Sequence, residues 1–220
     1  LMREPERVRD CLAAMAGAVD VPVTIKTRLG VDDDYSYGFL RDFVGRVSES
    51  GCSTWILHAR IALLSGLSPK ENRDVPPLHH DWVWRLKREM PALTVVINGG
   101  ITAVDEARAQ LAHVDGVMLG RAAYQTPWIL AECQRALCGG GAPPSRESVL
   151  AEFGDYLRGQ VEQGVPVKCL TRHLLGLFQG RPGARAWRRY LSQHAHRDDR
   201  NIAIVEEAHA AMAAGSRSAA

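Results

Sequence analysis

Four short apolar segments of this chain each end in side chains that are able to bind a ligand. Lys26, His58 and Asn98 close the first three segments, and the fourth leads into Gly120-Arg121. A helix pattern follows each segment, which is typical of parallel β/α units. The carboxyl ends of parallel strands meet at one edge of a sheet, where ligands bind. We therefore expect these side chains to converge on one site.

Two of the four strand ends carry groups that suit a phosphate. In Asn98-Gly99-Gly100 the glycines let the backbone approach an anion, and free N–H groups at the start of a helix donate to it. Arg121 adds a guanidinium that can bind a phosphate in a bidentate way. A glycine pair is also common in an ordinary turn between strand and helix. Two such signatures on successive strands nevertheless favour the phosphate clamp found after the last two strands of a (β/α)8 barrel.

Lys26 and His58 are polar residues at the ends of otherwise apolar strands. A lysine there is compatible with a surface residue whose stem packs on the sheet, and a single histidine is compatible with a buried structural residue. Together, however, the two side chains could hold the polar edge of a flavin ring and stabilise negative charge on its reduced form.

The second half of the chain contains a strongly basic segment. Between Pro166 and Arg197 there are seven lysine or arginine residues and no acidic one, although the formal net charge of the chain is only +2. Such a helix face is either simply solvated or binds a polyanion, and clustered arginine without balancing acid favours the polyanion. If the helix reaches back to the first of them, four arginines share the face opposite Trp187 and Leu191: Arg181, Arg185, Arg188 and Arg189.

The composition is that of an ordinary globular protein, with 46% hydrophobic and 24% charged residues. No apolar run approaches the roughly 18 residues needed to span a bilayer, and charges interrupt the first residues, so no signal peptide is expected. The five cysteines are scattered without C-x-x-C spacing, which predicts neither a disulfide framework nor a zinc site. We expect a reduced, cytoplasmic protein that binds no membrane and no metal.

The candidate site residues are positioned by alternating helices and strands in the first part of the chain. Apolar residues at helical spacing predict the helices, and short apolar runs predict the strands. Thr102 is expected to cap the helix after the third strand, with Asp105 completing a capping-box-like pair. A polar loop at 61–80 is long enough to be either functional or disordered. The predicted helices are 4–19, 37–47, 81–90, one after Thr102 and 122–137, and the predicted strands are 21–27, 54–57, 93–97 and 114–119.

After a linker rich in glycine and proline at 139–144, the apolar periodicity changes and predicts only helices. We expect a partial α/β barrel over 1–138, a helical bundle domain over 145–214 and a disordered tail at 215–220. Four strands of a barrel would leave two unpaired edges, so we interpret the chain as the C-terminal half of a barrel. The alternative is a complete small open sheet. The four helices are marked by apolar residues from Val149 to Val161, by Leu170, Leu174, Leu177 and Phe178, by Ala184, Trp187, Tyr190 and Leu191, and by the stretch 202–212.

Together these motifs resemble the tRNA-dihydrouridine synthases, and most of all the DusA subfamily, which acts on uridines at positions 20 and 20a of the tRNA D-loop. The resemblance spans nearly the whole chain and implies an FMN-binding (β/α)8 TIM barrel followed by a helical tRNA-binding domain. It rests on Ile25-Lys26-Thr27-Arg28, His58-Ala59-Arg60, the loop from Leu64 to Arg73, Ile97-Asn98-Gly99-Gly100-Ile101, Gly120-Arg121, and Leu175-Gly176-Leu177-Phe178-Gln179-Gly180 continuing to Trp187-Arg188-Arg189-Tyr190.

The resemblance also implies a reaction and the residues that serve it. NADPH reduces FMN, the reduced flavin gives a hydride to C6 of a uracil that is flipped out of the tRNA, and a cysteine protonates C5. Lys26 and His58 are implied to contact the flavin ring. Asn98, Gly99, Gly100, Gly120 and Arg121 are implied to bind the phosphate end of FMN. The residues implied to orient tRNA are Lys70, Glu71, Arg73, Arg185 and Arg188.

One part of the family pattern is missing from this sequence. The proton-donating cysteine belongs to an Asn-x-Gly-Cys-Pro motif upstream of the matched region, and no cysteine here precedes a proline. The first-strand flavin motif and the next glutamine contact are absent as well. We therefore expect no catalytic residue in this chain and no activity of the chain alone. A non-catalytic tRNA-binding fragment remains the main alternative, and the basic helical part disfavours a different FMN or sugar-phosphate barrel enzyme.

Overall fold

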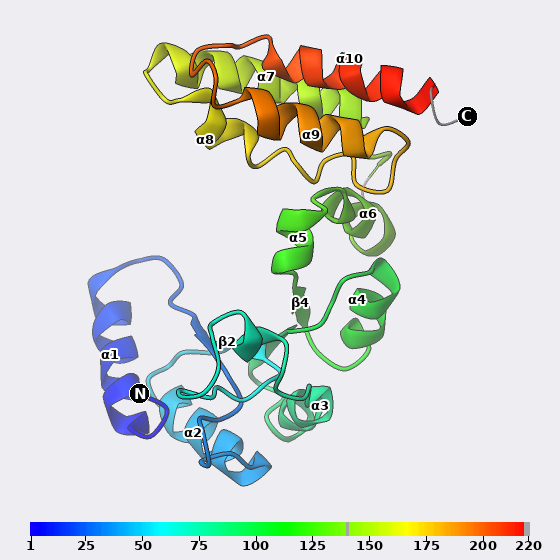
Figure 1. The fold of residues 1–220 in the computed structure, drawn as a ribbon. Coiled ribbons are helices and arrows are strands. Elements are labelled where there is room, and N and C mark those ends of the chain that lie inside the picture. The colour runs from blue at the N-terminus through cyan, green and yellow to red at the C-terminus, as the bar shows by residue number, and fades with distance from the viewer. Residues whose placement is uncertain (140, 218–220) are drawn as a thin grey trace. The chain divides into compact units, whose positions relative to one another are not determined.

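The computed structural model describes residues 1–139 and 141–217 of the chain. The chain divides into two compact units, Leu1–Gly120 and Arg121–Ala220 (Figure 1). The predicted linker at 139–144 therefore falls inside the second unit, and its residue 140 lies outside the described residues. None of the helices in the described part of the chain is both long and apolar enough to cross a membrane.

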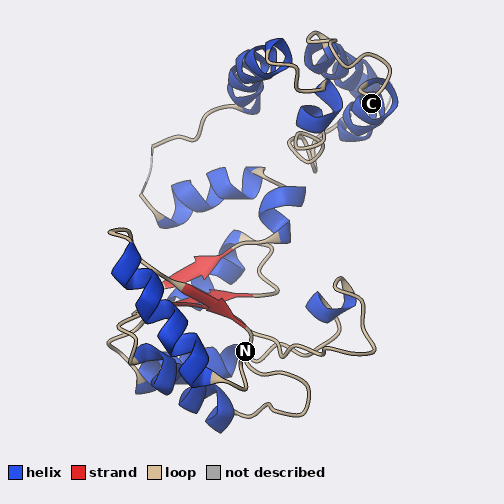
Figure 2. Ribbon diagram, turned by 90° about the vertical axis from the view of Figure 1, so that its left-hand side faces the viewer, coloured by secondary structure: helices blue, strands red, loops and turns tan. Residues whose placement is uncertain are grey.

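A four-stranded parallel sheet forms the centre of the first unit (Figure 2). Its strands lie side by side in chain order, with helices in the connections, so the fold is of the α/β class with a parallel sheet, as predicted. The register pairs Leu57 with Ile97 and His58 with Asn98, which aligns the carboxyl ends of the two central strands. The strands are β1 (Ile25–Thr27), β2 (Thr54–His58), β3 (Thr94–Asn98) and β4 (Gly116–Met118).

The helices of the first unit lie close to the predicted positions. The first residue of α2 is preceded by Ser36, whose Oγ accepts a hydrogen bond from the Phe39 N–H at 3.0 Å and caps the helix. One face of α2 is buried, and Phe43 on that face meets Trp55 of the sheet edge-on, with 6.1 Å between ring centroids. The helices are α1 (Pro5–Ala18), α2 (Tyr37–Ser48), the 3-10 turn η1 (Glu71–Arg73), α3 (His80–Glu89) and α4 (Val104–Leu111).

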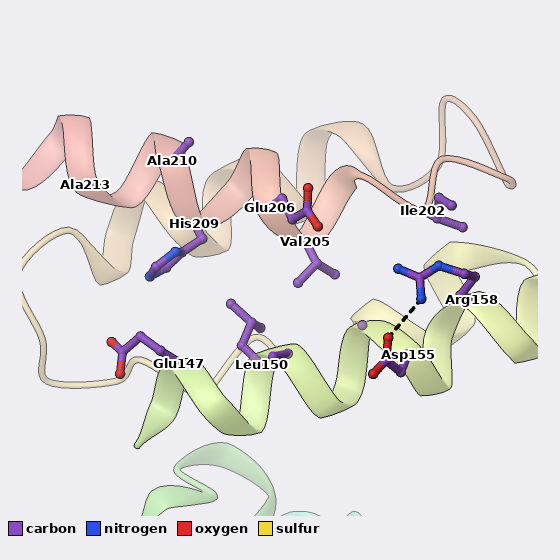
Figure 3. A pocket seen from close by; sticks show the side chains of 12 residues that line it. Glu147, Leu150, Asp155, Arg158, Ile202, Val205, Glu206, His209, Ala210 and Ala213 are labelled. Atoms are coloured by element: carbon purple, nitrogen blue, oxygen red, sulfur yellow. Dashed lines mark hydrogen bonds and ion pairs between the residues drawn. The ribbon is translucent and has the colours of Figure 1, made fainter. Parts of the chain in front are cut away.

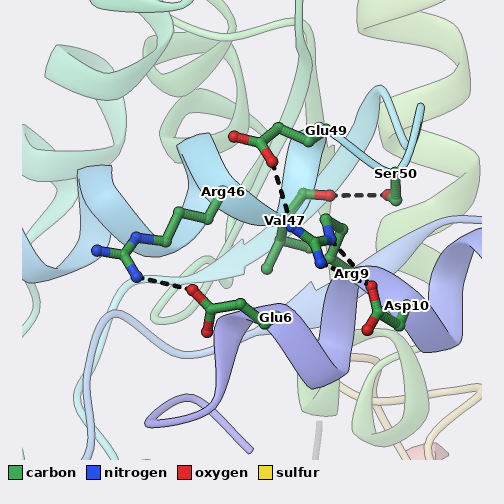
Figure 4. Close-up of polar contacts among 7 residues, drawn as sticks. All are labelled: Glu6, Arg9, Asp10, Arg46, Val47, Glu49 and Ser50. Carbon is green, nitrogen blue, oxygen red and sulfur yellow. Dashed lines mark hydrogen bonds and ion pairs between the residues drawn. The ribbon is translucent and has the colours of Figure 1, made fainter.

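Helices α1 and α2 are joined by polar contacts across their surfaces (Figure 4). Arg46 donates to Glu6 at 2.7 Å, and Arg9 reaches Glu49 at 3.4 Å. These side chains are mostly exposed, and exposed ion pairs each contribute about 0–1 kcal/mol. The pairs therefore orient α1 on α2 more than they stabilise the unit.

The two faces of the sheet are covered to different extents. Alternate residues point to one face, where Trp55, Leu57, Val95 and Ile97 are fully buried. On the opposite face, the row that joins Lys26 to neighbours on the other three strands is exposed or only half-buried. Parallel sheets are normally covered on both faces. Within the described residues, the face that carries Lys26 is therefore incompletely covered.

Two strands and one helix differ from the sequence predictions. Strand β1 starts at Ile25 rather than at residue 21, because Pro22 has no N–H for a sheet hydrogen bond and Val21 is exposed. Strand β4 covers only Gly116–Met118. The predicted helix at 122–137 is two helices, α5 (Arg121–Gln125) and α6 (Trp128–Leu137), because Pro127 cannot continue the hydrogen bonding of a helix interior.

The described part of the second unit contains helices and no strand. Its core includes Leu157, Phe178, Trp187, Leu191 and Ile204, all nearly or fully buried. The Trp187 indole N–H donates to the Leu174 carbonyl at 3.0 Å, so this large buried ring keeps its polar atom satisfied. After α5 and α6 the helices are α7 (Arg146–Glu162), α8 (Val167–Thr171), α9 (Ala184–His194) and α10 (Ile204–Arg217).

Two further predictions for this unit need correction. The predicted helix through Leu170, Leu174, Leu177 and Phe178 is wrong, because α8 ends at Thr171 and the following residues form turns. These residues are nevertheless buried in the core, so their apolar spacing indicates that they are buried but does not indicate a helix. Helix α10 runs to Arg217, so residues 215–217 of the predicted tail are helical, whereas 218–220 lie outside the described residues.

Candidate functional site

Polar residues meet at the carboxyl edge of the sheet in the first unit. His58 and Asn98 are paired in register at the ends of β2 and β3, and both are about nine-tenths buried. The Asn98 side-chain N–H donates to the Met118 carbonyl of β4 at 2.7 Å. The predicted neighbours His58, Asn98 and Gly99 are therefore brought together, and one hydrogen of the Asn98 amide is used to join β3 to β4.

The turn after β3 can only be formed by glycine without strain. Gly99 and Gly100 have φ angles of 114° and 74°, in the left-handed region that favours glycine. A Cβ on Gly99 would lie 3.5 Å from His58 Cε1, and a Cβ on Gly100 would lie 2.6 Å from Leu78 Cδ1. Among the described residues, the amides of Gly99, Gly100 and Ile101 donate no hydrogen bond. Three backbone donors are thus available in one turn.

The cap of α4 differs from the predicted one. The Glu106 carboxylate accepts hydrogen bonds from the Thr102 N–H at 2.7 Å, from the Thr102 hydroxyl at 3.0 Å and from the Ala103 N–H at 3.1 Å. Asp105, which was expected to complete the cap, pairs with Arg108 instead. The Thr102 backbone N–H, outweighing an opposing effect of burial, is the main reason that the pKa of Glu106 is lowered. The amides of Thr102 and Ala103 are therefore already satisfied, and the glycine turn supplies the remaining donors.

Lys26 lies on the incompletely covered face of the sheet. It occupies the middle of β1, in register with Ile56, and shares its face with His58 because both positions have the same alternation along their strands. Burial lowers the pKa of the Lys26 ammonium, and the nearby positive charge of Arg28 lowers it further. The Lys26 ammonium has thus lost part of its hydration on the face of the sheet that also carries His58.

The fourth strand leads to Gly120 and Arg121. A Cβ on Gly120 would lie 3.9 Å from the Asn98 side-chain nitrogen, so Gly120 adjoins the same edge of the sheet. Arg121 is the first residue of α5 and belongs to the second unit. The pairing of Arg121 with the glycine turn therefore stays a prediction.

Hydrogen bonds from the side chains of Arg28, Arg60 and Asn72 organise the long loop between β2 and α3, a role that the sequence analysis did not assign to them. Arg28 Nη1 donates to the carbonyls of Ile61 and Asn72 at 3.1 and 2.9 Å, and Arg60 Nε donates to the Pro76 carbonyl at 2.7 Å. The Asn72 side chain exchanges hydrogen bonds with the backbone of Leu63. The sequence signal was an arginine within two residues of the end of β1 and of β2, although the carbonyl partners of these arginines lie up to 44 residues away.

The loop residues predicted to orient tRNA lie at the 3-10 turn η1. Lys70 precedes the turn and Arg73 ends it, and both side chains are exposed. Glu71 accepts a hydrogen bond from the Ser68 N–H at 2.8 Å, and Ser68 Oγ accepts one from the Glu71 N–H at 3.3 Å. Hydrogen bonding from the Ser68 side chain, followed by that from the Ser68 backbone N–H, lowers the pKa of Glu71. Glu71 therefore fixes the turn that presents Lys70 and Arg73.

Comparison with known proteins identifies the family of this chain. The family model for dihydrouridine synthase (Dus) matches residues 1–214. The chain belongs to the dihydrouridine synthase family. It is 51% identical over 210 residues to the tRNA-dihydrouridine(20/20a) synthase of Shewanella oneidensis, covering 95% of this chain and 63% of that protein. It is 50% identical over 208 residues to the protein of that name from Xanthomonas campestris, covering 94% and 62%.

The chain therefore spans less than two thirds of the length of these curated relatives. A solved structure of dihydrodipicolinate synthase from Oceanobacillus iheyensis also matches, covering 96% of this chain and 71% of that one, at a TM-score of 0.35 and 11% identity. This likeness is too low to support an argument about the fold.

The basic segment of the chain lies partly on α9. Trp187 and Leu191 are buried, and Arg185 and Arg189 are exposed on the other side of the helix. Arg188 donates to the Gln179 side chain. Because α9 begins at Ala184, after Gly183 at φ 79°, Arg181 is not on the helix, and the predicted four-arginine helix face is reduced to three. Within the described residues, no carboxylate forms an ion pair with Arg181 or with these three arginines.

A cavity of about 480 Å³ lies between α7 and α10 in the second unit (Figure 3). Leu150 of α7 and Val205 of α10 line it from facing helices, and Arg158, which also lines it, pairs with Asp155 at 2.8 Å. Glu147 and Glu206 also line it, so the lining contains more acidic than basic side chains. None of the predicted site residues lines this cavity.

Proposed function

We propose that this chain is the part of a tRNA-dihydrouridine(20/20a) synthase that binds FMN in its first unit and tRNA in its second. The glycine turn carries the proposal: Gly99, Gly100 and Ile101 present amides that donate no hydrogen bond within the described residues, directly after the buried pair His58 and Asn98. This arrangement occurs in a chain that the dihydrouridine synthase model matches over residues 1–214.

The residues present fit the phosphate end of FMN. The amides of Gly99, Gly100 and Ile101 can donate to phosphate oxygens, and Asn98 retains a second side-chain N–H. Gly120 leaves room beside Asn98, and we propose that Arg121 adds a charge-assisted contact. A side chain on Gly100 would crowd Leu78. Substitution would also strain the backbone, because Gly100 has a φ angle of 74°.

Lys26 and His58 are proposed to bind the polar edge of the flavin ring. Burial and the positive charge of Arg28 lower the pKa of Lys26, which means that they destabilise its ammonium form. A negative charge on a bound flavin ring would stabilise the ammonium form again. FMN supplies hydride transfer when it is bound, with NADPH as the reductant. The Lys26 ammonium orients the ring and opposes its negative charge, and His58, buried on the same face, limits access of water.

The sheet is proposed to form four of the eight units of a (β/α)8 barrel. Its face beside Lys26 is incompletely covered within the described residues, which is unusual for a parallel sheet. The curated relatives are longer than this chain. The remaining strands of such a barrel would cover this face and complete the ring site.

The second unit is proposed to bind tRNA, with Arg185 and Arg188 among the phosphate contacts. Lys70, Glu71 and Arg73 are proposed to orient the same tRNA from the loop of the first unit. The second unit has a core of its own, built on Trp187, Leu157 and Ile204. This observation also supports the second candidate function, a tRNA-binding fragment without catalysis.

The chain is proposed to have no catalytic residue of its own, because no cysteine here precedes a proline as in the family motif. General acid catalysis contributes about 10²–10⁴-fold. The test is to incubate the chain with FMN, NADPH and unmodified tRNA, and to measure both tRNA binding and dihydrouridine. Binding without dihydrouridine is expected. Turnover comparable to that of a longer relative would contradict the missing-donor argument, and absence of tRNA binding would contradict the proposed function.

A further inference from the structure

Three hydrogen bonds connect two helices of the first unit to the glycine turn. Trp84 Nε1 donates to Gln110 Oε1 at 2.8 Å, the Gln110 side-chain nitrogen lies 3.3 Å from His80 Nδ1, and His80 Nε2 lies 3.0 Å from the Gly99 carbonyl oxygen. Trp84 and His80 are on α3 and Gln110 is on α4. We call this set of side chains, Trp84, Gln110 and His80, the α3–α4 relay.

The chemistry of these groups fixes the direction of every bond in the relay. The indole N–H of Trp84 can only donate, so the oxygen of the Gln110 amide faces Trp84 and its NH₂ group faces His80. The amide therefore donates to His80 Nδ1, which carries no hydrogen. The Gly99 carbonyl can only accept, so His80 Nε2 must carry the hydrogen. The relay thus selects one neutral tautomer of His80.

The surroundings hold the relay in place. The His113 ring stacks on Trp84, with 4.2 Å between centroids and 23° between planes. Gln110 is buried, and its two side-chain groups are both used. A buried amide that is fully satisfied on both sides has one orientation, because turning it over would set two donors against each other.

The relay also determines which way the next amide points. The Gly99 carbonyl and the Gly100 N–H belong to one peptide unit, and in a planar trans peptide they point in opposite directions; the chain has no cis peptide. Because His80 holds the carbonyl, the Gly100 N–H is directed away from His80. Glycines at φ 114° and 74° have little conformational restraint of their own, so the restraint comes from His80.

We propose that His80 is a positioning residue that presents the Gly100 N–H to a phosphate group, with Gln110 and Trp84 fixing the tautomer it needs. The proposal rests on the proposed FMN site and adds a residue to it. His80 acts through the Gly99 peptide as a neutral donor. Its effect is therefore confined to ligands that carry a phosphate.

The tautomer is tested by long-range ¹H–¹⁵N NMR of the full chain. Neutral His80 with the hydrogen on Nε2 is expected, and in Gln110→Leu, which removes the donor to Nδ1, the two tautomers should become mixed. A dominant Nδ1–H form in the unsubstituted chain would overturn the relay. This measurement needs no ligand.

Positioning is tested by titrating FMN and riboflavin, which lacks the phosphate, and following flavin fluorescence. His80→Phe should weaken FMN binding about tenfold, the effect of losing one well-oriented donor, and leave riboflavin binding unchanged. His80→Gln, which keeps a donor for the carbonyl, should recover most of the loss. His79→Phe is the matched control, because His79 stacks on Trp82 and is outside the relay.

The outcomes separate this inference from the proposed function. If the unsubstituted chain prefers FMN to riboflavin and His80→Phe keeps that preference, the positioning role is wrong and the FMN site stands. Equal weakening of FMN and riboflavin in His80→Phe would also overturn the role, because it would indicate general damage to the unit. A chain with no preference for FMN over riboflavin would overturn both the phosphate site and the role of His80.

Discussion

Asn98 shows how one side chain can serve both the sheet and the candidate site. Its amide is about nine-tenths buried and donates to the Met118 carbonyl of the adjacent strand. Leaving this partly buried carbonyl without a donor costs free energy, about 1–3 kcal/mol where burial is complete. The geometry of the strand ends therefore depends on an amide at this position.

Substitution of Asn98 should destabilise the first unit by an amount that depends on the replacement. Asn98→Ala should lower the free energy of unfolding by about 1–3 kcal/mol. Asn98→Asp should cost more, because a carboxylate has no hydrogen to donate and would face the Met118 carbonyl. Urea denaturation measures both variants. An Asn98→Asp chain as stable as the unsubstituted one would show that this contact is not formed.

The convergence of His58, Asn98 and the glycine pair follows from the sequence because consecutive parallel strands have a fixed alignment. The role of His80 does not follow from it. His80 contacts Gly99, which is 19 residues away, and Gln110, which is 30 residues away, and no local pattern encodes which helix faces meet. The contacts of Arg28 and Arg60 with the loop could not be predicted for the same reason. Their partners are backbone carbonyls, which every residue type has, so the sequence does not mark them.

At the scale of the element, a carboxylate in the first turn of α4 caps the helix. Glu106 accepts three hydrogen bonds from Thr102 and Ala103. Glu106→Ala should lower the free energy of unfolding by about 0.5–2 kcal/mol at pH 7. Asp105→Ala is the control, because Asp105 only pairs with Arg108 on the surface, and its effect should stay below about 0.5 kcal/mol.

The effect of Glu106 should depend on pH in a defined direction. Its pKa is lowered on folding from an ordinary value of 4.5, so the folded state binds fewer protons than the unfolded state near that pH. The stabilisation is therefore fully present above pH 4.5 and disappears as the pH falls through the folded pKa. Denaturation at pH 7 and pH 3 should show the Glu106→Ala difference shrinking at pH 3. A difference that grows at pH 3 would contradict the cap.

Helices α2 and α3 are joined by Tyr37, whose hydroxyl donates to Glu89 at 2.7 Å. Burial, followed by this hydrogen bond, raises the pKa of Tyr37 to about 12. Its contribution to stability should be complete below pH 10 and be lost between about pH 10 and pH 12. Absorbance at 295 nm follows the five tyrosines, among which the pKa of Tyr190 is also raised, because its hydroxyl donates to Glu207. Tyr37→Phe should therefore reduce the late-ionising phase, and Tyr35→Phe should leave it unchanged.

The elements also show where periodicity fails as a guide. Leu170, Leu174 and Leu177 have helical spacing, but the residues after Thr171 form turns, and Gly176 packs directly on the Gln125 backbone. A side chain there would displace the chain. The apolar spacing of these leucines reflects their burial in the core. The path of the backbone is set by the contact between Gly176 and Gln125, which are 51 positions apart, so a local sequence pattern cannot predict it.

For the whole molecule, the basic surface of α9 should make the proposed tRNA binding depend on salt. About three phosphate contacts, one for each arginine of α9, give a slope of about −2 to −3 in a plot of log affinity against log salt. Replacing Arg185 and Arg188 with alanine should reduce this slope by about 1–2. Arg158→Ala is the control, since Arg158 pairs with Asp155. An unchanged slope in the double variant would show that the arginines of α9 are only solvated.

The order of the strands in the sheet has a consequence for how the protein is made. Each strand pairs with the strand synthesised just before it, and the paired residues are only 20 to 40 positions apart. At about 5–20 residues per second on the ribosome, each new strand emerges within seconds of the partner it needs. The first unit can therefore assemble one strand at a time during translation, and its glycine turn and strand ends can form before the arginines of α9 have been translated.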